Sequence, residues 1–267
     1  MALVACRGAP PPAEDSLRIV SLQPQITETL FAIGAGDAVV GRSDYDAWPE
    51  SVRSLPSGGT ALTPNVEAVV GLRPTHVLIE ATEGARTDLL EPLAHVEALP
   101  WHQVADIGPS VRRLGELTGH EVQAERVAAQ MTAALRVDPP PTGTRTLMVY
   151  ASDDLASGPL WYVQRNSLHG AAMHAAGLVN AVDEDVSGAP SMPIERLLAV
   201  DPAQILILSS DDTITPAQRE RLTHAFDALT PLSAVQSGDI HVLASSRYHS
   251  TGPALVEFVD VLRGVAE

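Results

Sequence analysis

The sequence contains no lysine, so all 17 of its basic residues are arginine, and it has a single cysteine, Cys6. Without an ammonium side chain, neither Schiff-base chemistry nor the lysine of a P-loop phosphate site is available. A single cysteine excludes an internal disulfide. The 33 acidic residues bring the formal net charge to -16, and this charge repels phosphate groups. The composition therefore argues against nucleic acids and anionic membrane surfaces as partners.

Long apolar runs and aromatic residues are also scarce. No stretch approaches the roughly 20 apolar residues of a transmembrane helix. Aromatic residues make up only 4% of the chain, so the places where they occur are informative. At 267 residues the chain can bury a substantial core, and its length suits one large domain or two modest ones.

One segment occurs twice. Residues 65–80 read NVEAVVGLRPTHVLIE, residues 193–208 read PIERLLAVDPAQILIL, and the two align without a gap. The alignment places Glu67 on Glu195 and Val70 on Leu198. Each copy has the pattern of a short helix followed by a buried strand. Flanking segments repeat in the same order, with RIVSL matching RTLMVY and WHQVA matching IHVLA. The repeat favours two similar halves.

The expected fold is α/β, with two lobes that each contain a small parallel sheet wrapped by helices. Residues 17–108 form the first lobe and residues 138–267 the second. Residues 109–137 keep helical spacing with good helix formers, which predicts one long interlobe helix acting as a stiff strut. Within the first lobe we expect an apolar helix near 88–96 and a strand near 102–105. Residues 1–16 precede the first lobe as a proline-rich tether.

Ligands of parallel α/β sheets meet the loops beyond the carboxyl ends of the strands, which predicts a cleft between the lobes. A connection in the second lobe that is longer than its counterpart carries Trp161, and its exposure would be costly unless a ligand covers it. The candidate ligand-binding residues share this placement on loops at strand ends. They are Gln25, Tyr45, Trp48, Glu80, Trp161, Tyr162, Arg165, Arg247, Tyr248 and His249.

Three stretches together resemble a known family: RIVSLQPQITETLFAIGAGDAVVGRSDYDAWP, LPSGGTALTPNVEAVVGLRPTHVLI and SMPIERLLAVDPAQILI. They are similar to the helical-backbone class of ABC-transporter substrate-binding proteins, which bind cobalamin, ferric siderophores and haem. The pattern is closest to the vitamin B12-binding periplasmic proteins. The resemblance covers Arg18 to the C-terminus. It implies binding without catalysis, no resident cofactor, and delivery of a small metal chelate to a dimeric ABC permease in the membrane. We expect a monomer.

The resemblance ranks a corrinoid first, a ferric siderophore second and haem third as the ligand. Tyr45 and Trp161 fall where cobalamin-binding members place aromatic contacts, although Ala61 and Ala189 replace two further tryptophans. Haem-binding members carry an iron-ligating tyrosine just before the first repeated helix, and residues 57–63 contain none, which leaves a cleft tyrosine or histidine for that role. The cleft arginines would suit the anionic groups of a siderophore.

The repeated glutamates are candidate docking residues. In the family that the chain resembles, the glutamate early in each repeated helix docks on an arginine pocket of a two-fold symmetric permease, and these positions are Glu67 and Glu195. A glutamate in a first helical turn also complements the helix dipole, and capping alone would explain either residue. The duplicated position favours docking. The run LVAC at Cys6 resembles a bacterial lipoprotein cleavage box. It predicts lipidation of Cys6 and a periplasmic or cell-surface location.

Other chemistries remain as alternatives. A hydrolase could use Glu80 or the pair Asp153 and Asp154 as acid and base, although nothing fixes a second catalytic group at a required spacing. His169 and His174 are five residues apart, unlike the four-residue spacing of zinc helices, and we expect no metal site. A binding protein that reports to a sensor would share the fold and differ only in its partner.

Overall fold

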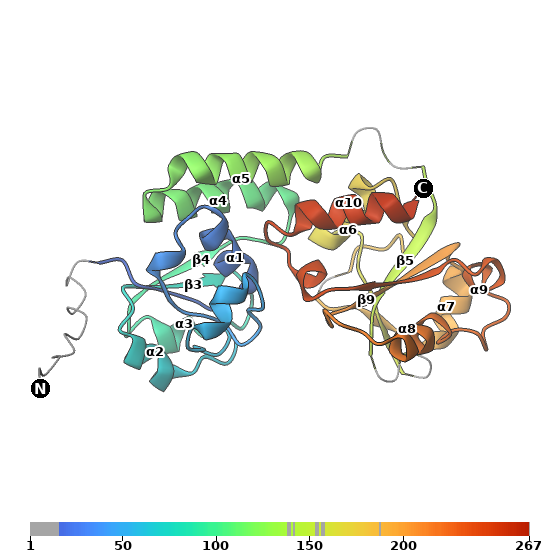
Figure 1. Cartoon of the computed structure of the whole chain (residues 1–267), viewed down its shortest axis with the longest axis horizontal. Coiled ribbons are helices and arrows are strands. Elements are labelled where there is room, and N and C mark those ends of the chain that lie inside the picture. Colours follow the sequence, from blue (N-terminus) through green and yellow to red (C-terminus); the bar gives the residue numbers. More distant parts are fainter. Residues whose placement is uncertain are drawn as a thin grey trace, which may run out of the picture.

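Two four-stranded parallel sheets form the centres of two lobes in the computed structural model (Figure 1). The structure describes residues 16–266 except 138, 139, 141, 153, 154, 156, 157 and 187. The strands of lobe one are β1 (Ile19–Ser21), β2 (Val39–Gly41), β3 (His76–Glu80) and β4 (His95–Leu99). Those of lobe two are β5 (Arg145–Tyr150), β7 (Val179–Asn180), β9 (Gln204–Ser209) and β10 (Ile240–Ala244). A short antiparallel pair, β6 (Leu160–Trp161) and β8 (Ser191–Met192), extends lobe two.

The strand orders confirm the predicted α/β fold of two similar lobes. Lobe one has the order β2-β1-β3-β4 and lobe two the order β10-β9-β5-β7. With β1 matched to β5, β2 to β7, β3 to β9 and β4 to β10, the two orders are identical. The central strands are continuous apolar runs, and Val77, Leu78 and Ile79 are fully buried. Such runs are typical of parallel strands with both faces covered.

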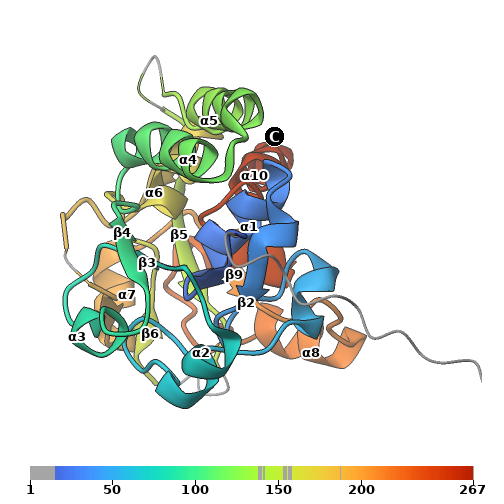
Figure 2. The ribbon, with the colours of Figure 1, turned by 90° about the vertical axis from the view of Figure 1, so that its left-hand side faces the viewer.

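Helices surround the two sheets (Figures 1 and 2). The α-helices are α1 (Pro24–Ala32), α2 (Val66–Leu72), α3 (Thr87–Leu90), α4 (Val104–Thr118), α5 (Glu121–Ala134), α6 (Leu168–Ala175), α7 (Ile194–Val200), α8 (Pro216–Thr223), α9 (Ser233–Ser237) and α10 (Leu255–Ala266). Three short 3-10 helices are η1 (Gly36–Ala38), η2 (Glu50–Ser54) and η3 (Ser246–His249). The repeated segments form α2 with β3 and α7 with β9, as predicted.

The single long interlobe helix predicted over 109–137 is wrong. The segment folds into two helices, α4 and α5, which pack side by side (Figure 1). Gly119 ends α4 with φ +71°, a left-handed conformation that glycine adopts without strain. A Cβ at Gly115 would lie 2.4 Å from the Cβ of Ala124, so the missing side chain lets the two helices approach. Helical spacing continues across the turn, which explains why periodicity alone did not reveal the break.

The strand predicted near 102–105 and the helix predicted near 88–96 are also wrong. The fourth strand of lobe one is β4, earlier in the chain, and only the short α3 precedes it. Residue 104 begins α4 because Gln103 and Asp106 form a capping box at its N-terminus. Pro109, the first residue of the predicted long helix, is instead the sixth residue of α4.

One apolar cluster extends through both lobes and the α4–α5 hairpin. It includes Ile19 and Leu30 of lobe one, Val111 of α4, and Met148 and Phe258 of lobe two. Helix α5 contacts both α1 and α10. Two smaller clusters fill the remaining faces of the sheets, one in each lobe. The lobes are therefore joined by packed side chains as well as by the chain itself.

Candidate ligand-binding cleft

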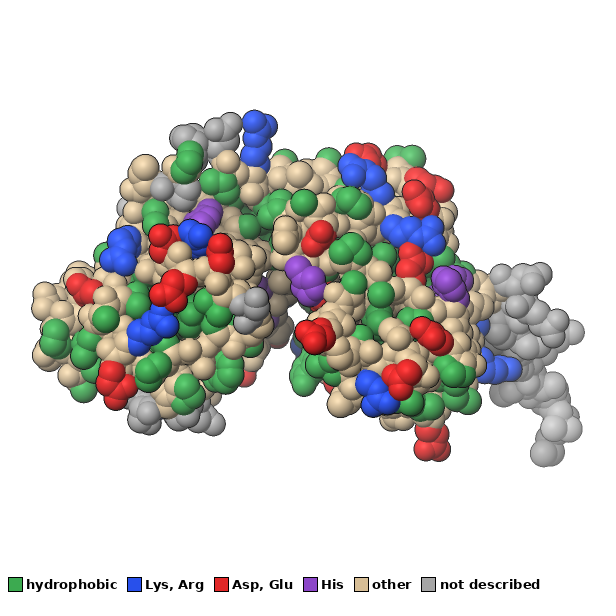
Figure 3. Space-filling model, turned by 180° about the vertical axis from the view of Figure 1, so that it is seen from behind, with side chains coloured by type: hydrophobic (Ala, Val, Ile, Leu, Met, Phe, Trp, Pro, Cys, Tyr) green, Lys and Arg blue, Asp and Glu red, His purple; other side chains and the backbone are tan. Residues whose placement is uncertain are grey.

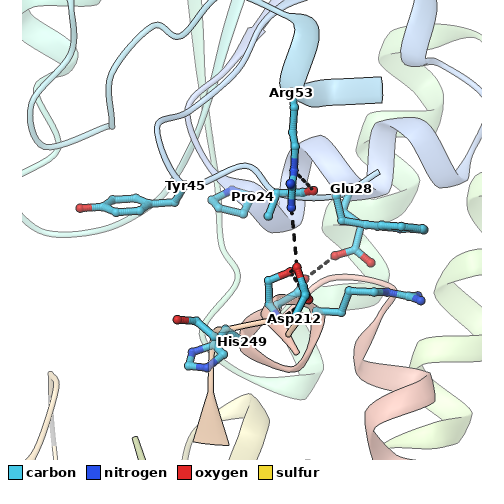
Figure 4. A pocket seen from close by; sticks show the side chains of 12 residues that line it. Pro24, Glu28, Tyr45, Arg53, Asp212 and His249 are labelled. Carbon is cyan, nitrogen blue, oxygen red and sulfur yellow. Dashed lines mark hydrogen bonds and ion pairs between the residues drawn. The ribbon is translucent and has the colours of Figure 1, made fainter. Parts of the chain in front are cut away.

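A cavity of about 530 Å³ lies between the lobes (Figure 4). Its walls come from the segments after β1 and β2 in lobe one and after β9 and β10 in lobe two, where the carboxyl ends of the parallel strands meet. The lining residues are Pro24, Glu28, Tyr45, Ala47, Trp48, Arg53, Ser210, Asp212, Ser246, Arg247, His249 and Ser250. Four of the residues predicted from the sequence are among them. The space-filling view shows the hollow between the two lobes from behind (Figure 3).

Two exposed aromatic residues of lobe one face this cavity. The side chain of Tyr45 is 76% exposed and that of Trp48 is 42% exposed. The guanidinium of Arg247, from lobe two, lies 4.4 Å from the centre of the Trp48 ring, which is a cation–π contact across the cleft. Arg247 also pairs with Glu257 at 2.7 Å. These residues place apolar surface and the guanidinium of Arg247 at the cavity wall.

An ion pair also crosses the cleft. The guanidinium of Arg53, on η2, lies 3.7 Å from the carboxylate of Asp212 in lobe two (Figure 4). The same carboxylate accepts hydrogen bonds from Ser245 and from the backbone and hydroxyl of Ser246. The backbone hydrogen bond from Ser246 is the main reason why the pKa of Asp212 lies below its usual value. Asp212 is already satisfied by those bonds and does not need every donor of Arg53. A guanidinium has five N–H donors, so Arg53 keeps donors for an anionic group in the cavity.

Glu28 is buried in the wall of the cavity and joins the two lobes. Its side chain projects from α1 and is 5% exposed. Oε1 accepts a hydrogen bond from the backbone N–H of Ala254 at 2.5 Å, and Oε2 accepts one from the hydroxyl of Ser250. Burial raises the pKa of this carboxyl. The start of α10 in lobe two is thereby held by a side chain of lobe one.

Two further contacts hold the same segment. Trp101 of lobe one donates its indole N–H to the carbonyl of Thr251 at 3.0 Å. Gly252 packs so closely that a Cβ there would lie 3.2 Å from Cα of Gln25. Residues 250–254 form what we call the interlobe latch, because Glu28, Trp101 and the backbone of α1 fix this segment to lobe one.

His249 presents a neutral imidazole at the cavity. Burial lowers its pKa, and its ring lies 5.6 Å from that of Tyr150 in a tilted contact. Its Nε2 is buried without a hydrogen-bond partner in the described part of the chain. A neutral ring with an unused nitrogen can accept or donate a hydrogen bond, or ligate a metal.

A second cavity of about 440 Å³ lies in lobe two. Tyr150 lines it, and its ring contacts that of His249, which lines the first cavity. Trp161 is 44% exposed at this cavity, whereas Tyr162 is buried. The lining residues are Tyr150, Ala151, Ser152, Trp161, Tyr162, Val163, Gln164, Ser167, His169, Gly188, Ala189 and Pro190.

Four predicted ligand residues line neither cavity. The amide of Gln25 donates to Glu80 at 2.6 Å, and His102 lies 2.9 Å from the other Glu80 oxygen. Arg165 pairs with the acidic run through Asp183 at 2.5 Å and Asp185 at 2.8 Å. These side chains satisfy one another within their own lobes.

The ring of Tyr248, the fourth of these residues, packs on Phe258 with centres 5.3 Å apart. Its carbonyl accepts a hydrogen bond from Nε2 of His169 at 2.8 Å. His169 therefore has a structural role, anchoring η3 from α6.

Sequence reasoning missed Glu28, Arg53 and Asp212. The sequence does single out Glu28, because it is the one acidic residue in the predicted helix QITETLFAIG, where its neighbours are apolar residues and threonines. Arg53 and Asp212 lie in ordinary polar loops, where only the fold brings them together. The Asp153 and Asp154 pair and Cys6 lie outside the described residues.

The family model described as "Periplasmic binding protein" matches residues 19–246. The chain belongs to this family of periplasmic binding proteins. The relatives of this periplasmic binding protein are solute-binding proteins, not enzymes. They therefore lend the hydrolase alternative no support. Within the described residues, no helix combines the length and apolar character needed to cross a bilayer.

Named relatives bind different metal chelates. A cobalamin-binding protein of Halobacterium salinarum is 29% identical over 90% of this chain, which spans 66% of the length of that relative. The periplasmic vitamin B12 binding protein of Vibrio cholerae has a similar fold, with a TM-score of 0.74, 20% identity and coverage of 93% of this chain and 96% of that one. A periplasmic haem-binding protein from Pseudomonas aeruginosa has a TM-score of 0.72, 24% identity and coverage of 93% and 92%.

Proposed function

We propose that this periplasmic binding protein captures a corrinoid of the cobalamin type between its lobes and delivers it to an ABC importer. The observation that carries the proposal is the set of exposed aromatic side chains, Tyr45, Trp48 and Trp161, around two neighbouring cavities. Each cavity has the size of a small-molecule site, about 300–1,000 Å³. The ring contact between Tyr150 and His249 shows that the two cavities are close neighbours, so that one large ligand with flat apolar surface could reach both. The halobacterial relative named for cobalamin supports the same ligand class.

A ferric siderophore or haem is the second candidate, and a specific observation favours it. Arg53 and Arg247 both line the first cavity, and Arg53 keeps free donors beside a carboxylate that is already satisfied. Anionic chelates carry carboxylate or similar groups that arginine binds with two parallel hydrogen bonds.

Delivery would use the glutamates of the repeated helices. Glu67 and Glu195 are exposed in the first turns of α2 and α7, one on each lobe. Two like charges on two like lobes suit a partner with two-fold symmetry. Lipidation of Cys6 would hold the protein at the membrane beside such a partner. A sensor in place of an importer would use the same ligand site.

Equilibrium titration of the purified protein tests the ligand. Quenching of tryptophan fluorescence is followed with cyanocobalamin, with haemin and a ferric siderophore as parallel ligands. We expect saturation by cyanocobalamin with a Kd near micromolar or tighter, and a large loss of affinity in Trp161→Ala. Val122→Ala is a matched control, because that side chain is exposed on α5 and lines neither cavity. Saturation by haemin or the siderophore alone would replace the corrinoid with that ligand.

A further inference from the structure

The two repeated helices, α2 and α7, are exposed in the same pattern, residue by residue. Each has one buried residue, Val69 in α2 and Leu197 in α7, and both are fully buried. The next residue in each helix is an exposed aliphatic side chain, Val70 at 50% and Leu198 at 42%. The helices lie on different lobes, both away from the α4–α5 hairpin (Figure 1). An aliphatic side chain is thus presented to solvent at the same position of both copies.

This exposure is unusual because it is duplicated. A single exposed aliphatic residue is ordinary on a protein surface. Here, however, neighbouring positions of the repeat differ in charge, with Ala68 matched to Arg196 and Arg73 matched to Asp201. The glutamate and the aliphatic residue, in contrast, are exposed in both copies and keep their chemical character. Packing within each lobe does not account for them, because the buried residue beside them already anchors the helix.

The shared residues form one small surface on each lobe. Residues three apart lie on the same side of a helix, so Glu67 is beside Val70, and Glu195 is beside Leu198. Neither glutamate side chain makes a hydrogen bond or ion pair with the described part of the chain, although arginines are present nearby in sequence. We call each combination of glutamate and aliphatic residue a docking pair. The residue that follows each aliphatic side chain is small and exposed, Gly71 or Ala199, so a partner can approach closely.

We propose that Val70 and Leu198 form the apolar half of two equivalent contacts with a two-fold symmetric permease. Each half of that permease would present an arginine beside an apolar hollow. The carboxylate supplies a directional ion pair, and the aliphatic side chain supplies the area that is removed from water on docking. The proposal rests on the proposed delivery function and adds a specific role for two residues outside the ligand site.

The test measures binding of the full chain to the cobalamin importer of its source organism in lipid nanodiscs. Val70→Thr combined with Leu198→Asn keeps side-chain size while removing apolar surface. We expect importer affinity to fall about tenfold or more in this variant, as suits loss of two half-exposed aliphatic contacts. The matched control is Val122→Thr, since Val122 is 81% exposed on α5 but has no counterpart in the repeat. Ligand affinity and the unfolding midpoint should be unchanged in both variants.

The outcomes separate the inference from the function. One outcome overturns the apolar role and leaves delivery standing. In that outcome the wild type binds the importer, Glu67→Gln with Glu195→Gln binds it more weakly, and the aliphatic variant binds it as well as the wild type. If the wild type does not bind the importer, delivery and the inference both fail. A dimer of the chain alone that dissociates in the aliphatic variant would identify a second copy as the occupant and also overturn the proposal.

Discussion

Replacing Glu28 with alanine should loosen the contact between the lobes. The substitution removes the acceptor for the backbone N–H of Ala254 and for the hydroxyl of Ser250, both in the interlobe latch. The N–H group stays buried, so water does not replace the lost partner freely. Trp101 and Gly252 still hold the segment, and we therefore expect a weakened interface, not separated lobes.

The size of the effect follows from the geometry at Glu28. A hydrogen bond to a charged group contributes about 1.5–3 kcal/mol, and an unsatisfied buried donor costs about 1–3 kcal/mol. Burying the carboxylate has its own cost, shown by its raised pKa, and that cost disappears with the side chain. We expect a net loss of about 2–4 kcal/mol in the free energy of unfolding at pH 7. Glu28→Gln keeps an acceptor for Ala254 and should lose roughly half as much.

Chemical unfolding with hydrogen exchange read by mass spectrometry checks this expectation. Amides of residues 250–254 should exchange faster in Glu28→Ala, whereas β9 at the centre of lobe two should keep its protection. Cyanocobalamin affinity should fall as well, because Glu28 and Ser250 line the first cavity. An unchanged unfolding midpoint together with unchanged exchange at 250–254 would refute the latch.

Two further predictions concern pH. Burial raises the pKa of Asp46 to about 6 in the folded chain, so the native state binds this proton more tightly than the unfolded chain does. Between pH 7 and 4 this group should add up to about 3 kcal/mol of stability, and Asp46→Asn should lose that gain. Burial lowers the pKa of His169 to about 4, so its contribution is full above pH 6.5 and lost as the pH falls toward 4. The wild type should lose about 3 kcal/mol of stability through His169 on acidification, and His169→Gln should reduce that loss. Denaturant titrations of the wild type and of each variant at pH 7 and 4.5 measure both effects. A change of stability in the opposite direction would contradict the corresponding prediction.

The repeat and the sheets were predictable because each depends on short-range patterns. Apolar runs such as 77–79 identified the buried strands, and the gap-free alignment of two segments predicted the duplicated topology. The α4–α5 hairpin was not predictable by periodicity, because the apolar spacing continues across Gly119. The local signs of the turn were Gly119 itself and the small residues Gly115 and Ala124 on either side of it, which the fold brings into contact.

The cleft was predictable as a place, and less so as a set of side chains. The strand-end rule located Tyr45, Trp48 and Arg247 at the first cavity. The same rule also selected Gln25 and Glu80, which bond to each other because the fold brings the ends of two strands together. Partnerships across the cleft depend on how the lobes are oriented, and the sequence does not encode that orientation in any local pattern.

The apolar cluster that runs through both lobes and the α4–α5 hairpin limits what can be separated. Although the halves share one topology, cutting the chain within the hairpin would expose the faces of α1, α5 and α10 that now bury each other. A half expressed alone would expose a large apolar surface, and we expect it to aggregate or to form a molten globule. Each of the two similar lobes therefore depends on the other for its stability. We expect this protein to unfold in a single cooperative step, not lobe by lobe.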